Sequence, residues 1–155
     1  MKRHTTLAAV GAVAAATAVT ASMLAAPNAS AGPITQIPAV GFQVSGLVIP
    51  GAAVVNVFAT PLGKGKTRFS APLDPGTCAS SAGGALVHID YVNTGSGRRG
   101  GVTVNPCPNI RVGSATATAT TGAGQVVTTS FIQGSGYKPN AGQPSLPGVG
   151  TFTAR

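Results

Sequence analysis

The stretch Ala85-Leu-Val-His-Ile-Asp-Tyr-Val92 alternates apolar and polar residues, which is the pattern of a β-strand with one buried face. Asn93-Thr-Gly-Ser-Gly97 follows it and has the composition of a turn. Gly100-Gly-Val-Thr-Val104 then has the composition of a returning strand. The sequence therefore predicts a β-hairpin, and we expect the rest of the fold to be built around it.

The two cysteines of the chain, Cys78 and Cys107, flank this hairpin. Cysteine pairs persist as disulfides in oxidising compartments, and two cysteines allow one intramolecular pairing. We therefore predict a Cys78–Cys107 disulfide, which would stabilise the fold by roughly 3–4 kcal/mol in the chain-entropy model. Free thiols and intermolecular bridges are the alternatives. A redox or zinc site of the Cys-x-x-Cys type does not fit, because the cysteines lie far apart in sequence.

The N-terminus has the three parts of a secretory signal. Met1–His4 is basic, Leu7–Leu24 carries no charge, and Ala29-Ser-Ala31 has the small-x-small pattern of a cleavage site. We expect cleavage after Ala31. A membrane anchor is the alternative, but the apolar run is mostly alanine, and Pro27 follows it instead of a basic stop-transfer cluster.

Composition predicts an all-β domain. The chain has 155 residues and a formal net charge of +8, with Asp74 and Asp90 as its two acidic residues. Turn residues are frequent, and runs of helix formers at helical spacing are missing. We expect residues 32–155 to form a single antiparallel β-sandwich with an immunoglobulin-like layout, rather than a small barrel. Disorder is the alternative, and residues 134–149, rich in glycine and proline, are expected to form a long loop.

Five further segments have strand character. Ala39–Val44 alternates, and Ala52–Ala59 is apolar enough to be buried on most of both faces in the middle of a sheet. Ile110–Thr121 has a plain period of two, Gln125–Ile132 is its expected hairpin partner, and Gly150–Arg155 is expected to close the fold. The alternating positions predict a buried core of Val55, Val57, Val87, Ile89, Tyr91, Val102, Val104 and Phe152.

The basic residues fall in two groups. Pro61-Leu-Gly-Lys-Gly-Lys-Thr-Arg68 is expected to be a solvated loop, and the second group lies at the tip of the central hairpin. The loop does not match a phosphate-binding motif, because position 60 is threonine and Pro72 would stop the helix that must follow. Aromatic residues for base stacking are not interleaved, so nucleic-acid binding is not predicted. The candidate residues for binding an anionic surface are Lys64, Lys66, Arg68, Arg98 and Arg99.

Residues suited to catalysis are few. Downstream of the signal the chain has one histidine, His88, which shares a strand face with Asp90 and could pair with it. No Gly-x-Ser-x-Gly elbow supplies a nucleophile, and two ligands are too few for a metal site. Asp74 lies in an Asp-Pro-Gly turn, where it is expected to bond the turn backbone. We therefore predict no enzymatic activity, no cofactor and no metal.

The chain resembles small exported actinobacterial β-sandwich proteins of uncharacterised type. The resemblance rests on the signal ending at Asn28–Ala31, the Val/Thr/Gly-rich strands, the cysteine pair and the ending Leu146-Pro-Gly-Val-Gly-Thr-Phe152. It implies an exported β-sandwich and assigns no functional residue, because it includes no catalytic or ligand motif.

The functional expectation is a secreted or cell-wall-associated protein that binds or structures something and does not catalyse. Its partners are expected to be anionic cell-envelope components or an unknown protein, and the mature form is expected to be a monomer without a transmembrane segment. The alternatives are a secreted effector or inhibitor that acts on a protein, and a small-molecule carrier.

Overall fold

The computed structural model describes residues 32–43, 51–109, 113–135 and 145–155. The expected signal peptide, residues 1–31, lies outside these ranges, as does the 136–144 part of the expected long loop. Strands dominate the described residues, and every strand pair is antiparallel. The prediction of an all-β, antiparallel chain is therefore confirmed. No helix among the described residues is long and apolar enough to cross a membrane.

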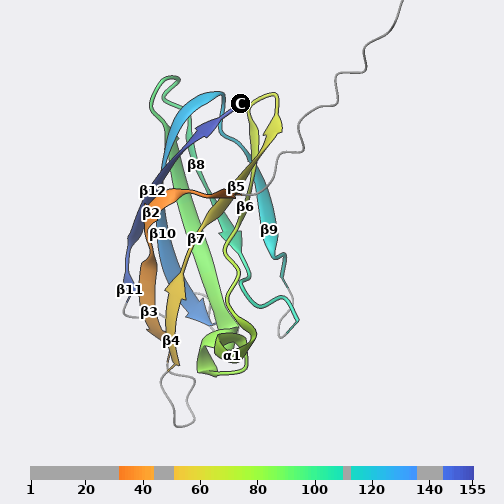
Figure 1. Ribbon diagram of the computed structural model, residues 1–155, viewed down its shortest axis with the longest axis vertical. Coiled ribbons are helices and arrows are strands. Elements are labelled where there is room, and N and C mark those ends of the chain that lie inside the picture. The colour runs from red at the N-terminus through yellow and green to blue at the C-terminus, as the bar shows by residue number, and fades with distance from the viewer. Residues whose placement is uncertain (1–31, 44–50, 110–112, 136–144) are drawn as a thin grey trace, which may run out of the picture.

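The strands form three sheets that run along the long axis of the molecule (Figure 1). The five-stranded sheet has, in order, β2 (Thr35–Ile37), β12 (Gly148–Ala154), β10 (Gly124–Ser135), β7 (Ala85–Asn93) and β8 (Arg99–Val104). The four-stranded sheet has β1 (Gly32–Pro33), β5 (Phe58–Gly63), β6 (Lys66–Ser70) and β9 (Thr116–Thr120). The small sheet has β11 (Ser145–Leu146), β3 (Ala39–Gln43) and β4 (Gly51–Val55). Two short helices, α1 (Pro75–Cys78) and the 3-10 turn η1 (Ser81–Gly84), lie at one end.

The central hairpin, β7 and β8, is confirmed. The second expected hairpin, Ile110–Thr121 with Gln125–Ile132, is wrong, because β9 pairs with β6 whereas β10 pairs with β7 and β12. Val87 pairs with Val104, and two positions along the strand Ile89 pairs with Val102. Strand β7 also pairs with β10 along its whole length, so it lies inside the five-stranded sheet. A Cβ atom on Gly100 would come within 2.6 Å of the Tyr91 hydroxyl oxygen, so a glycine is needed where the Tyr91 ring crosses β8.

Most of the predicted core is buried. Val102 and Phe152 are only partly buried. Phe69, which the sequence did not place in the core, is fully buried, and its ring centroid lies 6.0 Å from that of Tyr91. The core positions confirmed as buried are Val55, Val57, Val87, Ile89, Tyr91 and Val104.

The expectation that Ala52–Ala59 is one strand buried on both faces is wrong. The segment divides into β4 and β5, which belong to different sheets, and only one face of each is covered. Val54 and Asn56 are exposed as a result. At the break, the Gln36 side chain replaces a neighbouring strand: its Nε2 donates to the Val57 carbonyl oxygen (3.0 Å), and its Oε1 accepts from the Val57 N–H (2.9 Å).

The expected Pro61–Arg68 loop is also wrong in part, because these residues form the β5–β6 hairpin. Only a tight turn around Lys64 separates the strands, and Lys64 itself adopts a positive φ of 52°. Lys66 and Arg68 are strand residues that point outward, and the residues that alternate with them point into the core. The apolar content of this strand is low because one of its two buried residues is Thr67.

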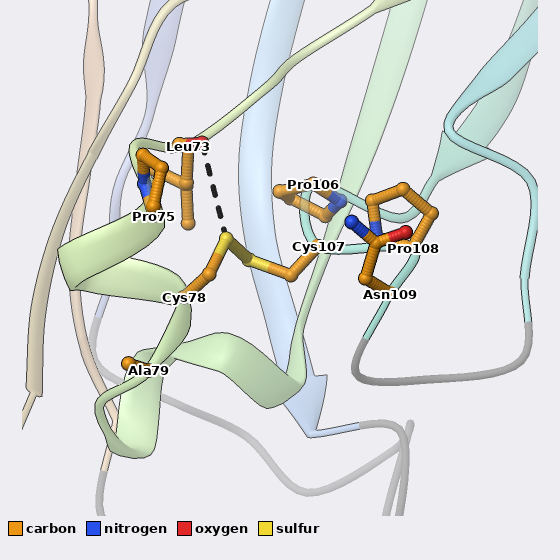
Figure 2. Close-up of a pocket in the computed structure, with 8 residues that line it drawn as sticks. All are labelled: Leu73, Pro75, Cys78, Ala79, Pro106, Cys107, Pro108 and Asn109. Carbon is orange, nitrogen blue, oxygen red and sulfur yellow. Dashed lines mark hydrogen bonds between the residues drawn. A yellow bond between two sulfur atoms is a disulfide. The ribbon is translucent and has the colours of Figure 1, made fainter.

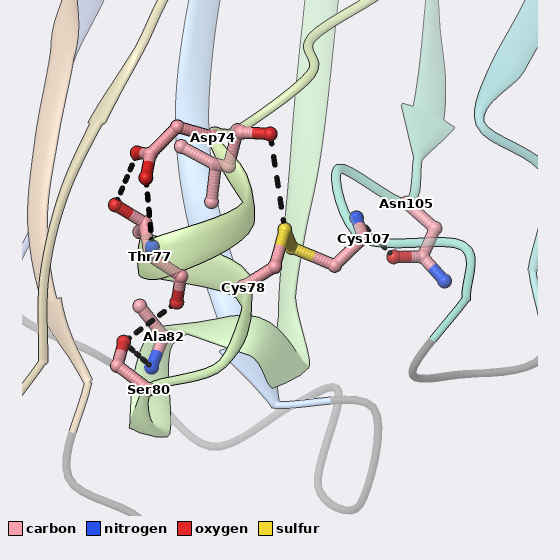
Figure 3. The surroundings of a disulfide bond; sticks show 8 residues. Asp74, Thr77, Cys78, Ser80, Ala82, Asn105 and Cys107 are labelled. Atoms are coloured by element: carbon pink, nitrogen blue, oxygen red, sulfur yellow. Dashed lines mark hydrogen bonds between the residues drawn. A yellow bond between two sulfur atoms is a disulfide. The ribbon is translucent and has the colours of Figure 1, made fainter.

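The Cys78–Cys107 disulfide is present and joins α1 to the segment that follows β8 (Figure 3). Asp74 caps α1: the hydroxyl group and the backbone N–H of Thr77 donate to its carboxylate and lower the pKa of Asp74. The expected role of Asp74 as a turn-bonding residue is thereby confirmed. On the other side, the Asn105 Oδ1 atom accepts from the Cys107 N–H (3.0 Å).

Replacing an inward-facing residue of β7 by a charged one should unfold the protein. Val87→Asp and Ile89→Asp each bury an unpaired carboxylate, and we expect each to lower the free energy of unfolding by about 4 kcal/mol or more. Val92→Asp is the control, because Val92 lies on the same strand and is 45% exposed. Urea unfolding followed by circular dichroism measures the difference. An Ile89→Asp variant as stable as the Val92→Asp control would show that the strand register is wrong.

Replacing Gln36 should destabilise the break between β4 and β5. Gln36→Leu leaves the N–H and C=O of buried Val57 without partners, at a cost of about 1–3 kcal/mol. Gln36→Glu should also destabilise, because a carboxylate cannot donate to the Val57 carbonyl oxygen. Gln133→Leu changes an exposed glutamine and is the matched control. Thermal unfolding measures all three variants, and equal melting temperatures for Gln36→Leu and Gln133→Leu would contradict the role of Gln36.

Candidate functional site

Three turns and the C-terminal residue meet at the end of the molecule farthest from α1 (Figure 1). The Gly65 carbonyl oxygen, in the β5–β6 turn, accepts from the Gly122 N–H of the β9–β10 turn (2.9 Å). The Gly65 N–H donates to the Arg155 carbonyl oxygen (3.2 Å). The β7–β8 turn joins them through the Thr94 N–H, which donates to the Gln125 carbonyl oxygen (3.0 Å). Segments far apart in sequence are therefore held together by backbone hydrogen bonds.

Asn93 connects two of these turns through its side chain and is fully buried. Its Nδ2 donates to the carbonyl oxygens of Thr121 (3.0 Å) and Ala123 (2.9 Å) in the β9–β10 turn. Its Oδ1 accepts from the N–H groups of Gly95 (3.0 Å) and Ser96 (2.9 Å) in its own turn. Both donors of the amide are thereby satisfied and its oxygen accepts two bonds, which orders the β7–β8 and β9–β10 turns relative to each other.

A buried hydroxyl pair connects the third turn. The Oγ1 atoms of Thr67, on β6, and Thr121 lie 2.8 Å apart, and both side chains are fully buried. One hydroxyl group donates to the other, and the Thr121 Oγ1 atom also lies 3.4 Å from the Gly65 carbonyl oxygen and 3.3 Å from that of Gly122. A polar residue is therefore tolerated where the pattern of β6 would place an apolar one. The three turns thus present their exposed side chains from ordered positions.

The exposed charged side chains that the structure describes at this end, which we call the basic end, are cations: Lys64, Lys66, Arg98, Arg99 and Arg155. The structure brings together the two groups that the sequence predicted separately. Arg68 lies farther along β6. Sequence reasoning missed Arg155, because only the hydrogen bond from Gly65 reveals that the last residue lies beside the β5–β6 turn.

The two carboxylates are engaged elsewhere. Asp74 caps α1 at the opposite end, and Asp90 lies on the outward face of β7, where its Oδ1 is 3.2 Å from the His88 Nε2 atom. Among the residues that the structure describes, this histidine–aspartate contact is the one ion pair found. The cations of the basic end are therefore not neutralised by a side-chain partner in the described ranges.

The expected pairing of His88 with Asp90 is confirmed, and Thr103 adds a third member. The His88 Nδ1 atom lies 3.0 Å from the Thr103 Oγ1 atom, so both ring nitrogens are engaged. A Cβ atom on Gly101 would lie 2.8 Å from the Asp90 carboxylate, so the glycine leaves room for the pair. Within the described ranges, no group of three metal-ligating side chains is found. The sequence did not reveal Thr103 because the contact depends on the cross-strand register.

Two open grooves of about 290 Å³ each lie away from the basic end. The first borders the disulfide, between α1 and the segment after β8 (Figure 2). The second lies over the outer face of β2, β12 and β10. Both are near the lower limit of about 300 Å³ for ligand pockets and contain no charged side chain. The first groove is lined by Leu73, Pro75, Cys78, Ala79, Pro106, Cys107, Pro108 and Asn109.

Replacing Asn93 should loosen the basic end and destabilise the fold. Asn93→Ala leaves the buried Thr121 carbonyl oxygen without this donor, at an expected cost of about 1–3 kcal/mol. Asn93→Asp should cost more, because a carboxylate would face two carbonyl oxygens. Asn56→Ala, at an exposed asparagine, is the control. Urea unfolding measures the three variants, and an Asn93→Asp protein as stable as the Asn56→Ala protein would contradict the assignment.

No family model, no curated protein and no solved structure matches this chain. We therefore infer its function from the arrangement of its own residues.

Proposed function

We propose that this is an exported, non-catalytic protein that the basic end retains on anionic polymers of the cell envelope. The observation that carries the proposal is the convergence of cations from two hairpin turns and the C-terminal residue on one end of the molecule. Hydrogen bonds order these turns before any ligand arrives, so binding loses less conformational entropy than it would with disordered loops. The full sequence has a formal net charge of +8, and +6 remains once Lys2 and Arg3 are removed with the signal segment.

Export is part of the proposal, and two features support it. The N-terminal segment has the charge and apolar pattern of a secretory signal ending at Ala31. The Cys78–Cys107 disulfide is typical of proteins that fold in an oxidising compartment. Outside the membrane, the polymers of the envelope are the anionic partners that the basic end would meet first.

We also propose that the strands form a β-sandwich with an immunoglobulin-like layout. The order β2-β12-β10-β7-β8 supports this layout, because a strand near the N-terminus lies beside the last strand. Residues from all three sheets contribute to one cluster of buried side chains, as two facing layers require. The proposed sandwich layout and the proposed binding by the basic end require no catalytic residue.

Retention by exposed charges should be weak and sensitive to salt. The Debye length falls from about 10 Å at 0.1 M salt to about 3 Å at 1 M, so envelope-bound protein should be released between these concentrations. The variant Lys64→Gln/Lys66→Gln/Arg98→Gln/Arg99→Gln should be found in the medium already at 0.1 M. Immunoblotting of the cell and medium fractions measures the distribution.

A matched pair of double variants separates the basic end from overall charge. Lys64→Gln/Arg99→Gln and Gln133→Glu/Asn109→Asp each lower the net charge by two, but the second pair lies at exposed positions nearer α1. Asn109 borders the groove beside Pro75, and Gln133 pairs with Leu86, near the start of β7. We expect the first pair to release the protein and the second to leave it on the cells. Equal release would assign retention to overall charge, and unchanged partitioning of the four-fold variant would refute the proposal.

A further inference from the structure

On the outer face of the β6–β9 strand pair, cations of β6 lie beside hydroxyl groups of β9. Lys66 pairs with Thr120 and Arg68 with Thr118, and directly paired residues of an antiparallel ladder point to the same side of the sheet. All four side chains are exposed, whereas Thr67 and its inward neighbours are covered. We call this surface the cation–hydroxyl ladder, and it consists of Lys66, Arg68, Ser70, Thr116, Thr118 and Thr120.

The ladder side chains are free to bind a ligand. In the described part of the chain, no hydrogen bond or ion pair engages the side chains of Lys66, Arg68, Thr118 or Thr120. Asp74 and Asp90 belong to other elements, and neither forms an ion pair with the ladder. The surface therefore has donors and positive charge without a carboxylate partner in the described residues.

The ladder continues the basic end along the strand. Successive outward residues of a strand are about 6.8 Å apart, so Arg68 extends the cationic surface by about 7 Å beyond Lys66, and Ser70 adds a hydroxyl group about 7 Å farther along. The first two rungs, Lys66–Thr120 and Arg68–Thr118, each place one cation beside one hydroxyl group, with Cβ atoms about 5 Å apart. The third rung, Ser70–Thr116, places two hydroxyl groups side by side. An anionic group with two free oxygen atoms, held at such a rung, would accept one hydrogen bond from the cation and one from the hydroxyl group.

We propose that the cation–hydroxyl ladder binds an extended phosphodiester polymer, one phosphate per rung. Phosphate oxygens accept from lysine, arginine and threonine side chains alike, and arginine is suited to bidentate contacts with phosphate. Three extended backbone bonds span about 3.4 Å, so a repeat of six bonds, with one phosphate and three carbons, spans about 7 Å and matches the rung spacing. This inference rests on the proposed function and names the polymer that the envelope would supply.

The probe is poly(glycerol phosphate), which has this repeat, in a chain long enough to cover the ladder and as a dimer of the repeat. Fluorescence anisotropy measures its binding to protein purified from the producing cells. The ladder variant is Arg68→Gln/Thr118→Val. The control, Asn109→Asp/Thr35→Val, lowers the net charge by one and removes one exposed hydroxyl group, both at surfaces outside the ladder.

We expect the ladder variant to bind the long polymer about tenfold more weakly than the control does, and the control to match the wild type. The slope of log K against log salt should fall in magnitude by about 0.7 for each phosphate contact removed. The dimer, which spans fewer rungs, should bind more weakly than the long polymer. A polyuronate, with carboxylates on rigid sugar rings, should also bind more weakly than poly(glycerol phosphate).

Equal affinities of the ladder variant and the control would contradict the proposal that the ladder binds the polymer. Equal affinities of the wild type for the dimer and the long polymer would contradict it as well. Equal affinity for the polyuronate would overturn the assignment of a phosphodiester. These failures are distinct from failure of the proposed function, because the Lys64→Gln/Arg99→Gln variant, which changes no ladder residue, would still lose salt-sensitive retention on cells if only the ladder were wrong.

Discussion

The burial of the inward face of β7 is the interaction on which the rest of the structure depends. Val87 and Ile89 are fully buried, and β7 pairs with β8 on one side and β10 on the other. Strand pairing satisfies the backbone N–H and C=O groups of β7, and the burial of apolar side chains stabilises its inward face. Only one register meets both conditions. From this strand the core extends across to Phe69, whose ring stacks on that of Tyr91 and meets Phe152 edge-on.

Polar side chains complete the fold where the strand ladders end. Gln36 substitutes for a strand beside Val57, where the chain leaves one sheet for another. Asn93 performs a similar role between two turns, and the Thr67–Thr121 pair connects a third. Each is a buried amide or hydroxyl group with its partners supplied, which is the condition under which polar groups are tolerated inside a protein.

In this fold, the charged side chains are separate from the side chains that form the core. The basic residues that the structure describes lie on turns, at outward strand positions and at residue 155, and each of them is exposed. The turns that carry them are ordered by Asn93 and by backbone hydrogen bonds, and the acidic residues serve a helix cap and a histidine contact elsewhere. A positive surface on an ordered scaffold is consistent with the binding to an anionic polymer that we propose.

The sequence by itself determined the β class, the central hairpin, the cysteine pairing and most of the core, because alternation with a period of two is a local property of the chain. Only the tertiary structure decided that Ala52–Ala59 divides between two sheets, that Phe69 lies in the core, and that Arg155 lies beside the β5–β6 turn. These features depend on which distant strands become neighbours. That choice follows from the packing of whole faces and the satisfaction of buried backbone groups, neither of which has a local signal in the residues concerned.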